Sequence, residues 1–159
     1  MAKHSAGILM YRRVADGVRV LLVHPGGPFW QKKDRGAWTI PKGEKTEGED
    51  GEAAARREFS EELGFTADGP LAPLGQVRQA GGKWVEAFAL AGAFDVSAFS
   101  SNRFEIEWPP KSGHLRSFPE VDRAAWFTLE AARDKILAAQ APFLDRLEAL
   151  VRQEDGATP

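Results

Sequence analysis

The stretch Gly43–Phe65, GEKTEGEDGEAAARREFSEELGF, decides the fold around it, because it specifies where one helix begins and ends. Asp50 is a good N-cap, since its carboxylate can accept a hydrogen bond from an amide of the first turn. Gly64 suits the left-handed turn that commonly ends a helix. We therefore expect a helix over residues 51–63, seated on a sheet by an apolar stripe made of Ala55, Phe59 and Leu63.

Three glutamates share one face of this predicted helix. At about 100° per residue, Glu61 and Glu62 fall with Glu58 inside a wedge of roughly 100°. Taken alone, the segment EFSEEL is best interpreted as a solvated acidic helix face. Oxygen-only ligation is also what hard cations prefer, so the pattern indicates Mg²⁺ or Mn²⁺ and not zinc. The chain has no cysteine and only three scattered histidines, which agrees with that choice of metal.

The whole stretch is similar to the Nudix box, G-x5-E-x7-R-E-U-x-E-E-x-G-U, where U is a bulky apolar residue. Its positions are filled here by Gly43, Glu49, Arg57, Glu58, Phe59, Glu61, Glu62, Gly64 and Phe65. With all of them in register, a merely solvated acidic face is no longer the better interpretation. Outside the box, the order of the segments from G-x-W-T-I-P-K-G-E to E-V-D-x-x-x-W-F resembles a small bacterial Nudix hydrolase.

This resemblance implies a role for each residue of the box. Glu58, Glu61 and Glu62 would bind the metal, together with the backbone carbonyl of Lys42 beside Gly43. Glu49 and Arg57 would orient the box, and Arg57 would thereby act in catalysis with Glu61 and Glu62. Gly43 and Gly64 would be structural.

A further glutamate outside the box often completes such a site or serves as the base. Our candidate is Glu120, in an expected loop over residues 118–122. Glu86 and Glu107 are its rivals, because both lie on predicted strands.

The resemblance also implies the reaction and the kind of substrate. Nudix enzymes cleave a nucleoside diphosphate linked to another moiety, and metal ions activate the attacking water. Lys42 and Lys83 flank glycines and are candidate phosphate contacts. Trp30 and Trp84 could stack on a base, although core packing is an alternative for both.

The identity of the substrate is less sharply indicated. The segment Trp38–Gly43 resembles the W-x-x-P-K-G of dinucleoside polyphosphate hydrolases, a form shared with some enzymes that act on oxidised dGTP. A tyrosine after the box, associated with binding of dinucleoside polyphosphates, is missing here, because the only tyrosine is Tyr11. We therefore expect a dinucleoside polyphosphate or a (d)NTP-like substrate.

Two other functions remain as alternatives. The first is a nucleotide-sensing or partner-binding module on the same fold, which the intact Glu58, Glu61 and Glu62 disfavour. The second is an RNA 5′-end pyrophosphohydrolase. A net charge of −2, a pI near 6.0 and the lack of a basic run argue against general nucleic-acid binding.

Length and hydropathy indicate how the 159 residues are organised. We expect one domain over residues 1–152, a disordered tail over 153–159, and a monomer or homodimer. No apolar stretch approaches the ~18 residues of a membrane span. The N-terminal segment MAKHSAGILMYRR lacks the apolar core of a signal peptide, so we expect a cytoplasmic protein.

The remaining elements follow from apolar periodicity and turn residues. Strands are expected over residues 6–13, 18–24, 37–40, 74–79, 84–91, 104–108 and 124–127, and helices over 129–137 and 142–152. Mixed strands with an early and a terminal helix predict an α+β domain. The resemblance implies more specifically an α/β/α sandwich, with a mixed sheet between helices.

Overall fold

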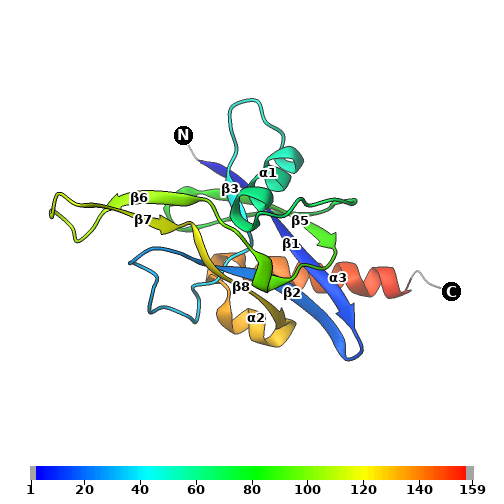
Figure 1. The fold of residues 1–159 in the computed structure, drawn as a ribbon. Coiled ribbons are helices and arrows are strands. Elements are labelled where there is room, and N and C mark those ends of the chain that lie inside the picture. The colour runs from blue at the N-terminus through cyan, green and yellow to red at the C-terminus, as the bar shows by residue number, and fades with distance from the viewer. Residues whose placement is uncertain (1–2, 157–159) are drawn as a thin grey trace.

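A computed structural model describes residues 3–156 of the chain (Figure 1). The strands are β1 His4–Val14, β2 Gly17–Pro25, β3 Lys42–Glu44, β4 Ala72–Arg78, β5 Trp84–Ala91, β6 Arg103–Glu107, β7 Leu115–Pro119 and β8 Val121–Thr128. The helices are α1 Gly51–Leu63, α2 Leu129–Lys135 and α3 Ala141–Gly156, with short 3₁₀ turns η1 Ala80–Gly82, η2 Val96–Ala98 and η3 Ala138–Gln140.

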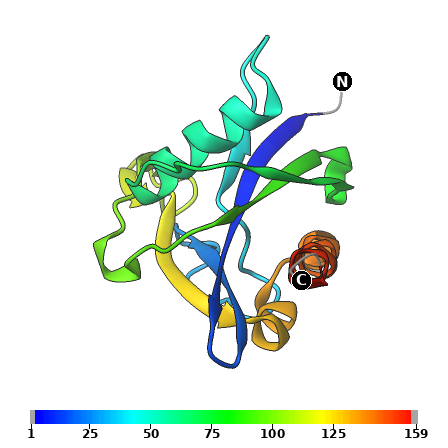
Figure 2. The ribbon, with the colours of Figure 1, turned by 90° about the vertical axis from the view of Figure 1, so that its right-hand side faces the viewer.

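The central sheet is mixed and lies between helices, as Figure 2 shows with α1 on one side and α3 on the other. Its strand order is β4-β5-β1-β2-β8, and β3 pairs with β1. The β1–β5 pair is parallel, whereas the other ladders of this sheet are antiparallel. The predicted α+β class and the α/β/α arrangement are confirmed.

Strand β1 separates two apolar cores because its successive side chains point to opposite faces. Ile8 and Met10 pack on the α1 side, in a cluster that includes Phe59. Leu9 and Tyr11 pack on the opposite side, where the cluster includes Phe143 of α3. A strand buried on both faces reads as a continuous apolar run, which is how Ala6–Tyr11 reads in the sequence.

One edge of β1 is shared by two strands, β2 and β3. β2 pairs with β1 from Tyr11 to Val14, and β3 pairs with it from Ser5 to Gly7. Residues 39–41 lie in between: the amide of Ile8 donates to the carbonyl of Pro41 (3.1 Å), and Thr39 exchanges two 2.9 Å bonds with Val23. The segment that leads into β3 is therefore wedged between β1 and β2.

Helix α1 has the predicted bounds and the predicted caps. The Asp50 carboxylate accepts a hydrogen bond from the amide of Ala53 (2.8 Å). Gly64 adopts the left-handed conformation, with φ of 68°, and its amide donates to the carbonyl of Ser60 (2.7 Å). Strong local signals at both ends explain why this element could be placed from sequence.

Two expectations about strands are wrong. Residues 37–40 contribute only isolated bridges, from Thr39 to Val23 and from Trp38 to Ile136, and the strand begins later, at Lys42. The expected loop 118–122 is largely strand, because β7 runs to Pro119 and β8 starts at Val121. Strand β7 was missed, since its residues, LRSFP, show no clean alternation of apolar and polar side chains.

The expected tail is also partly wrong. Helix α3 continues through 153–156 to Gly156, where Arg13 of β1 forms ion pairs with Glu154 and Asp155. Residues 157–159 of that expectation lie outside the described residues.

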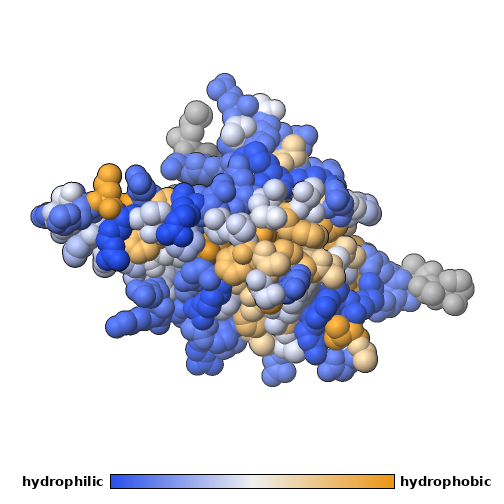
Figure 3. All heavy atoms as spheres, viewed as in Figure 1, coloured by the Kyte–Doolittle hydropathy of each residue, from blue (hydrophilic) through white to orange (hydrophobic). Residues whose placement is uncertain are grey.

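Strands β6 and β7 form a separate two-stranded hairpin that projects from the body (Figure 1). The face seen in Figure 3 is polar along α1 and along most of this hairpin, and it carries an apolar patch below α1. None of the helices in the described part of the chain is long and apolar enough to span a membrane.

Candidate active site

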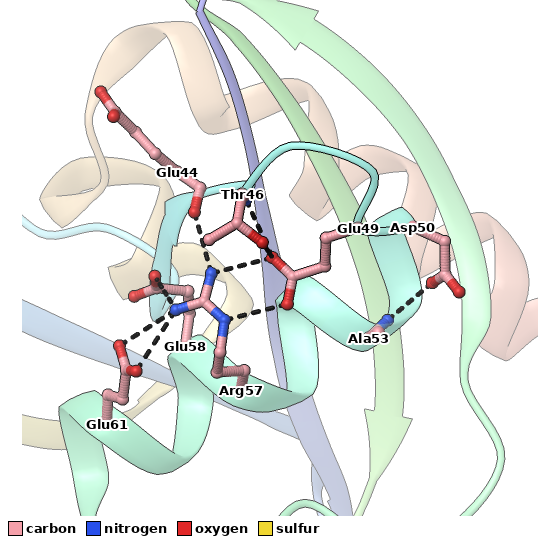
Figure 4. A network of polar contacts seen from close by, with 8 residues as sticks. All are labelled: Glu44, Thr46, Glu49, Asp50, Ala53, Arg57, Glu58 and Glu61. Atoms are coloured by element: carbon pink, nitrogen blue, oxygen red, sulfur yellow. Dashed lines mark hydrogen bonds and ion pairs between the residues drawn. The ribbon is translucent and has the colours of Figure 1, made fainter.

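Arg57 is the centre of the polar network on α1 (Figure 4). Its guanidinium donates to both carboxylate oxygens of Glu49 at 2.9 and 3.0 Å, and to the carbonyl of Glu44 at 3.0 Å. The Nη1 atom donates to Glu58 at 2.8 Å and to Glu61 at 3.3 Å. One planar fork thus fixes three carboxylates at once, a geometry that lysine cannot reproduce.

Glu49 connects this network to the loop that precedes α1. Its carboxylate accepts hydrogen bonds from the amide and the hydroxyl of Thr46. Together with the bonds from Arg57, these hold the pKa of Glu49 down at about 2. Glu49 is therefore ionised and oriented toward Arg57, which agrees with the structural role expected for it.

Glu58 is packed against the backbone of Gly43. A Cβ atom added at Gly43 would lie 2.1 Å from the Glu58 carboxyl, so any other residue at this position would have to displace that carboxyl. Glu58 is 8% exposed, and burial raises the pKa of its carboxyl, while Arg57 acts in the opposite direction. The box glycine thus allows the close approach of a candidate metal ligand.

Glu62 is the most strongly perturbed carboxyl of the face. Burial raises its pKa to about 8, against the attraction of Lys42 and a hydrogen bond from the Lys42 amide (3.1 Å). The pKa of the Lys42 amine is in turn lowered, chiefly by burial. A desolvated carboxyl with a perturbed pKa in a cleft is a typical candidate for a functional group.

The acidic residues repel one another. The charges of Glu58 and Glu120 contribute to the raised pKa of Glu62, and the charge of Glu61 contributes to that of Glu120. Such a set of carboxylate oxygens suits a divalent cation. Within residues 3–156, however, no group of three or more acidic or histidine side chains is arranged to hold a metal ion. The reason is that Glu58 and Glu61 face Arg57, whereas Glu62 faces the amide of Lys42. The donor chemistry fits the cation, and side-chain rotation would have to bring the oxygens together.

Glu120 lies beside this face and not on a free loop. Its amide donates to the carbonyl of Asn102 (2.8 Å), and its carbonyl accepts from the amide of Gly26 (2.9 Å). Burial raises the pKa of its carboxyl, and Glu61 contributes to the shift. The backbone of Glu120 is therefore fixed at the junction of β7 and β8, and only its side chain can reorient.

The two rival glutamates lie elsewhere. Glu86 faces the first turn of α1, where a Cβ atom added at Gly51 would meet its carboxylate at 1.9 Å. Glu107 accepts a 2.6 Å hydrogen bond from the amide of Lys111 on the projecting hairpin. Of the three candidates, Glu120 is the one that shares a cavity with Glu62.

This cavity has a volume of about 230 Å³ and combines acidic, cationic and apolar walls. It is lined by Val23, Pro25, Trp30, Ala37, Thr39, Lys42, Glu62, Gln79, Glu120, Val121 and Leu137. Its volume is below the ~300 Å³ at which pockets for whole drug-sized ligands begin, so a larger ligand would extend beyond it.

The structure brings two of the four expected substrate contacts to this cavity. Trp30 and Lys42 line it. Lys83 and Trp84 do not; Lys83 is exposed, although its charge contributes to the lowered pKa of Lys42. The Trp84 ring lies under the Arg78 guanidinium, 6.0 Å from its centroid.

Sequence reasoning missed the residues that hold the cavity walls. His24 is fully buried, with Nδ1 2.8 Å from Asp122 and Nε2 2.6 Å from the carbonyl of Lys33. It ties β8 to the loop that carries Trp30. Gln140, also fully buried, accepts from the amide of Ile40 at 3.0 Å. An isolated polar residue in a strand or before a helix gave no signal of such contacts.

The acidic helix face organised by Arg57 thus lies next to a cleft that contains Lys42. The profile of the NUDIX domain matches residues 1–147, and the chain belongs to this family.

Individual relatives agree with that assignment. The solved Ap4A hydrolase of C. elegans, a binary complex, superposes with a TM-score of 0.66 over 96% of this chain and 99% of that one, at 26% identity. The NUDIX domain of Shewanella oneidensis NrtR, complexed with ADP ribose, gives a TM-score of 0.66 over 95% and 89%; at 16% identity it shows the fold alone. An RNA pyrophosphohydrolase of Caulobacter vibrioides is 47% identical over 55 residues, about a third of each protein (31% and 32%).

Proposed function

We propose that this protein is a divalent-metal-dependent pyrophosphohydrolase that cleaves a nucleoside diphosphate linked to another moiety, by attack of water at phosphorus. The observation that carries the proposal is the position of Glu62 and Glu120 in the wall of a cleft, directly beside the face organised by Arg57. Membership of the Nudix family supports the same reaction class.

Glu58, Glu61, Glu62 and the backbone carbonyl of Lys42 would hold Mg²⁺ or Mn²⁺. The bound cation neutralises charge on phosphoryl oxygens and lowers the pKa of water. Arg57 contacts both Glu58 and Glu61 on one side of α1, so rotation of these side chains away from Arg57 would be needed to bring their oxygens to the cation. Lys42, the first residue of β3, lines the cavity and would contact a phosphate oxygen.

Glu120 is the proposed general base. A carboxylate bound to a cation is a poor base, because the cation lowers its pKa. Glu120 comes from another part of the chain, and burial raises the pKa of its carboxyl, which makes its carboxylate a stronger proton acceptor than an ordinary one. It would accept the proton that the attacking water loses.

The proposed substrates are dinucleoside polyphosphates and (d)NTP-like compounds, since a similar solved structure is an Ap4A hydrolase. A second candidate is the 5′ end of RNA, favoured by the segment shared with the Caulobacter RNA pyrophosphohydrolase.

A substrate panel tests the proposal directly. Diadenosine polyphosphates, ordinary and oxidised dNTPs, ADP-ribose and 5′-triphosphorylated RNA would be offered with Mg²⁺, with Mn²⁺ and with EDTA. We expect metal-dependent hydrolysis of at least one nucleotide, with ¹⁸O from labelled water on one phosphorylated product. Binding without hydrolysis of any compound would instead support the nucleotide-sensing alternative.

A further inference from the structure

Strand β2 carries a buried histidine that the proposed chemistry does not use. His24 is fully buried, and its two ring nitrogens face two different oxygens. Nδ1 lies 2.8 Å from a carboxylate oxygen of Asp122, and Nε2 lies 2.6 Å from the carbonyl oxygen of Lys33. Val23 and Val121, which neighbour this pair in the sequence, line the cavity. His24 therefore connects β8 to the loop after β2 at a place where both strands form the cavity wall.

The loop after β2 depends on this contact. Within residues 3–156, the hydrogen bonds of residues 27–33 stay inside that segment, apart from the one between the Lys33 carbonyl and His24. The amide of Lys33 donates to the carbonyl of Trp30 (3.0 Å), and its ammonium lies 5.1 Å from the centroid of the Trp30 ring. A ring contact of Phe29 with the projecting hairpin is a further anchor. His24 thus supplies the polar connection to the turn that places Trp30 in the cavity wall.

Both contacts of His24 need a proton. A backbone carbonyl oxygen only accepts, so Nε2 must carry a hydrogen. An ionised carboxylate also only accepts, so either Nδ1 carries a hydrogen as well or the carboxyl of Asp122 holds it. An imidazole is ordinarily more basic than a carboxyl group, and the guanidinium of Arg123, 3.7 Å from the same oxygen, favours the charged carboxylate. The proton therefore belongs on His24, and the ring is an imidazolium.

This charge is compatible with the burial of the ring. An unpaired charge inside a protein is costly, whereas here each ring N–H has an oxygen acceptor and the charge has a carboxylate partner. The neighbouring cations have partners of their own. The Arg123 guanidinium lies 5.2 Å from the centroid of the Trp38 ring, and the Lys33 ammonium lies over Trp30.

We propose that His24 is a positioning residue, which holds the turn of Trp30 in the cavity wall as a doubly protonated ring between Asp122 and Lys33. Its effect on the reaction rests on the proposed function. That effect should fall on substrate binding, because Trp30 is a candidate substrate contact, and much less on the chemical step. The protonation of the ring and the position of Trp30 can both be measured without substrate.

Long-range ¹H–¹⁵N spectra of the histidine rings test the charged form, because an imidazolium and the two neutral tautomers differ in their nitrogen shifts. We expect His24 to keep both ring protons at pH 8, where an ordinary imidazole, with a pKa of about 6.5, has lost one. The exposed His4 and His114 provide that comparison in the same spectrum. Asp122→Asn should make the His24 ring neutral with both contacts kept, because an amide can donate to Nδ1.

The position of Trp30 is the second measurement. In His24→Gln the new amide can donate to the Lys33 carbonyl, but its oxygen then faces the Asp122 carboxylate. The indole N–H signal of Trp30, assigned with Trp30→Phe, should therefore shift, whereas that of Trp84, which lies beside Arg78 and outside the cavity, should not.

Kinetics separate positioning from chemistry. His24→Gln should raise KM by about 5–10-fold and change kcat by less than about 2-fold, as expected when a binding contact is lost. The double variant His24→Gln/Asp122→Asn should bring KM back toward wild type, because one amide can then donate to the other. His114→Gln, on the projecting hairpin, is the matched control and should change neither KM nor the Trp30 signal. Folding would be checked by circular dichroism, and the ring spectra of wild type and Asp122→Asn test the inference if His24→Gln does not fold.

Several outcomes would overturn the inference. They are a neutral His24 ring at pH 8, a ring that stays doubly protonated in Asp122→Asn, and an unchanged Trp30 signal or KM in a folded His24→Gln protein. Hydrolysis by a protein whose His24 is neutral would remove the positioning role and leave the proposed function standing. The expected spectra without hydrolysis of any nucleotide would do the reverse.

Discussion

The box helix and the cavity beside it are built in opposite ways. The residues that face Arg57 come from one continuous stretch, Glu44–Glu61, and its network is set by caps and helical spacing. The cavity wall is assembled from distant segments; Gln79 and Gln140 are 61 residues apart, and Ile40 and Gln140 are 100 apart. The acidic face thus depends on one local stretch, whereas the cavity wall depends on contacts between distant segments.

The largest expected effect is that of substitutions on the acidic face of α1. Glu61→Gln or Glu62→Gln should lower kcat by at least ~10²-fold, because each removes charge that would hold the cation against the developing phosphoryl charge. The fold should survive, since removing a like charge relieves repulsion. Steady-state kinetics with Mg²⁺ measures the effect, and Glu47→Gln, at an exposed position in the preceding loop, is the control. Near-normal turnover by folded variants would show that these glutamates do not bind the metal needed for the reaction.

Glu120 lies where the acidic face of α1 meets the cavity, and its substitution tests the assignment of the general base. Glu120→Gln should lower kcat by about 10- to 100-fold and change KM much less, because a base acts mainly in the transition state. The same measurement on Glu86→Gln and Glu107→Gln should show little change, since both carboxylates lie elsewhere. If one of those two variants loses activity while Glu120→Gln keeps it, the assignment of the base is wrong.

Substitution of Arg57 tests how much its hydrogen-bond network stabilises α1. Arg57→Ala removes charge-assisted hydrogen bonds and leaves Glu58 beside Glu61, at a cost of about 2 kcal/mol in the free energy of unfolding. Tm should fall by about 4–8 °C, and activity should fall with it.

The neighbouring arginine provides the control for this effect. Arg56 donates to the carbonyls of Ala67 and Gly69 and does not touch the candidate ligands. Arg56→Ala should therefore lower Tm with a much smaller loss of kcat. An Arg57→Ala protein with unchanged Tm would contradict the structural role of Arg57.

The smallest effect concerns pH and Glu62. Its pKa is raised from the usual 4.5 to about 8 in the folded protein, so the folded state holds the proton more tightly than the unfolded state. The resulting stability is fully present below about pH 4.5 and is lost as pH rises through about 8. In EDTA, the Tm of Glu62→Gln relative to wild type should therefore rise between pH 5 and pH 8.5. A constant difference would show that Glu62 does not carry this shift.

What could be predicted from the sequence follows the same division. Helix α1, with its Asp50 cap and Gly64 terminus, was predicted correctly because the signals are local. The pairing of β7 with β6 was not, because residues 109–117 carry no apolar alternation. The orientation of Gln79 depends on a contact with Gln140 that no spacing in the sequence indicates. The candidate ligands were found by pattern, whereas the walls of their cleft required the fold.

The role of the acidic face can be tested by one measurement. Binding of Mn²⁺ would be titrated by calorimetry in wild type, Glu61→Gln and the exposed-loop control Glu47→Gln. We expect Glu61→Gln to weaken Mn²⁺ binding, because it removes a carboxylate that would hold the cation, and Glu47→Gln to leave it unchanged. Equal binding of Mn²⁺ by wild type and a folded Glu61→Gln protein would contradict the account.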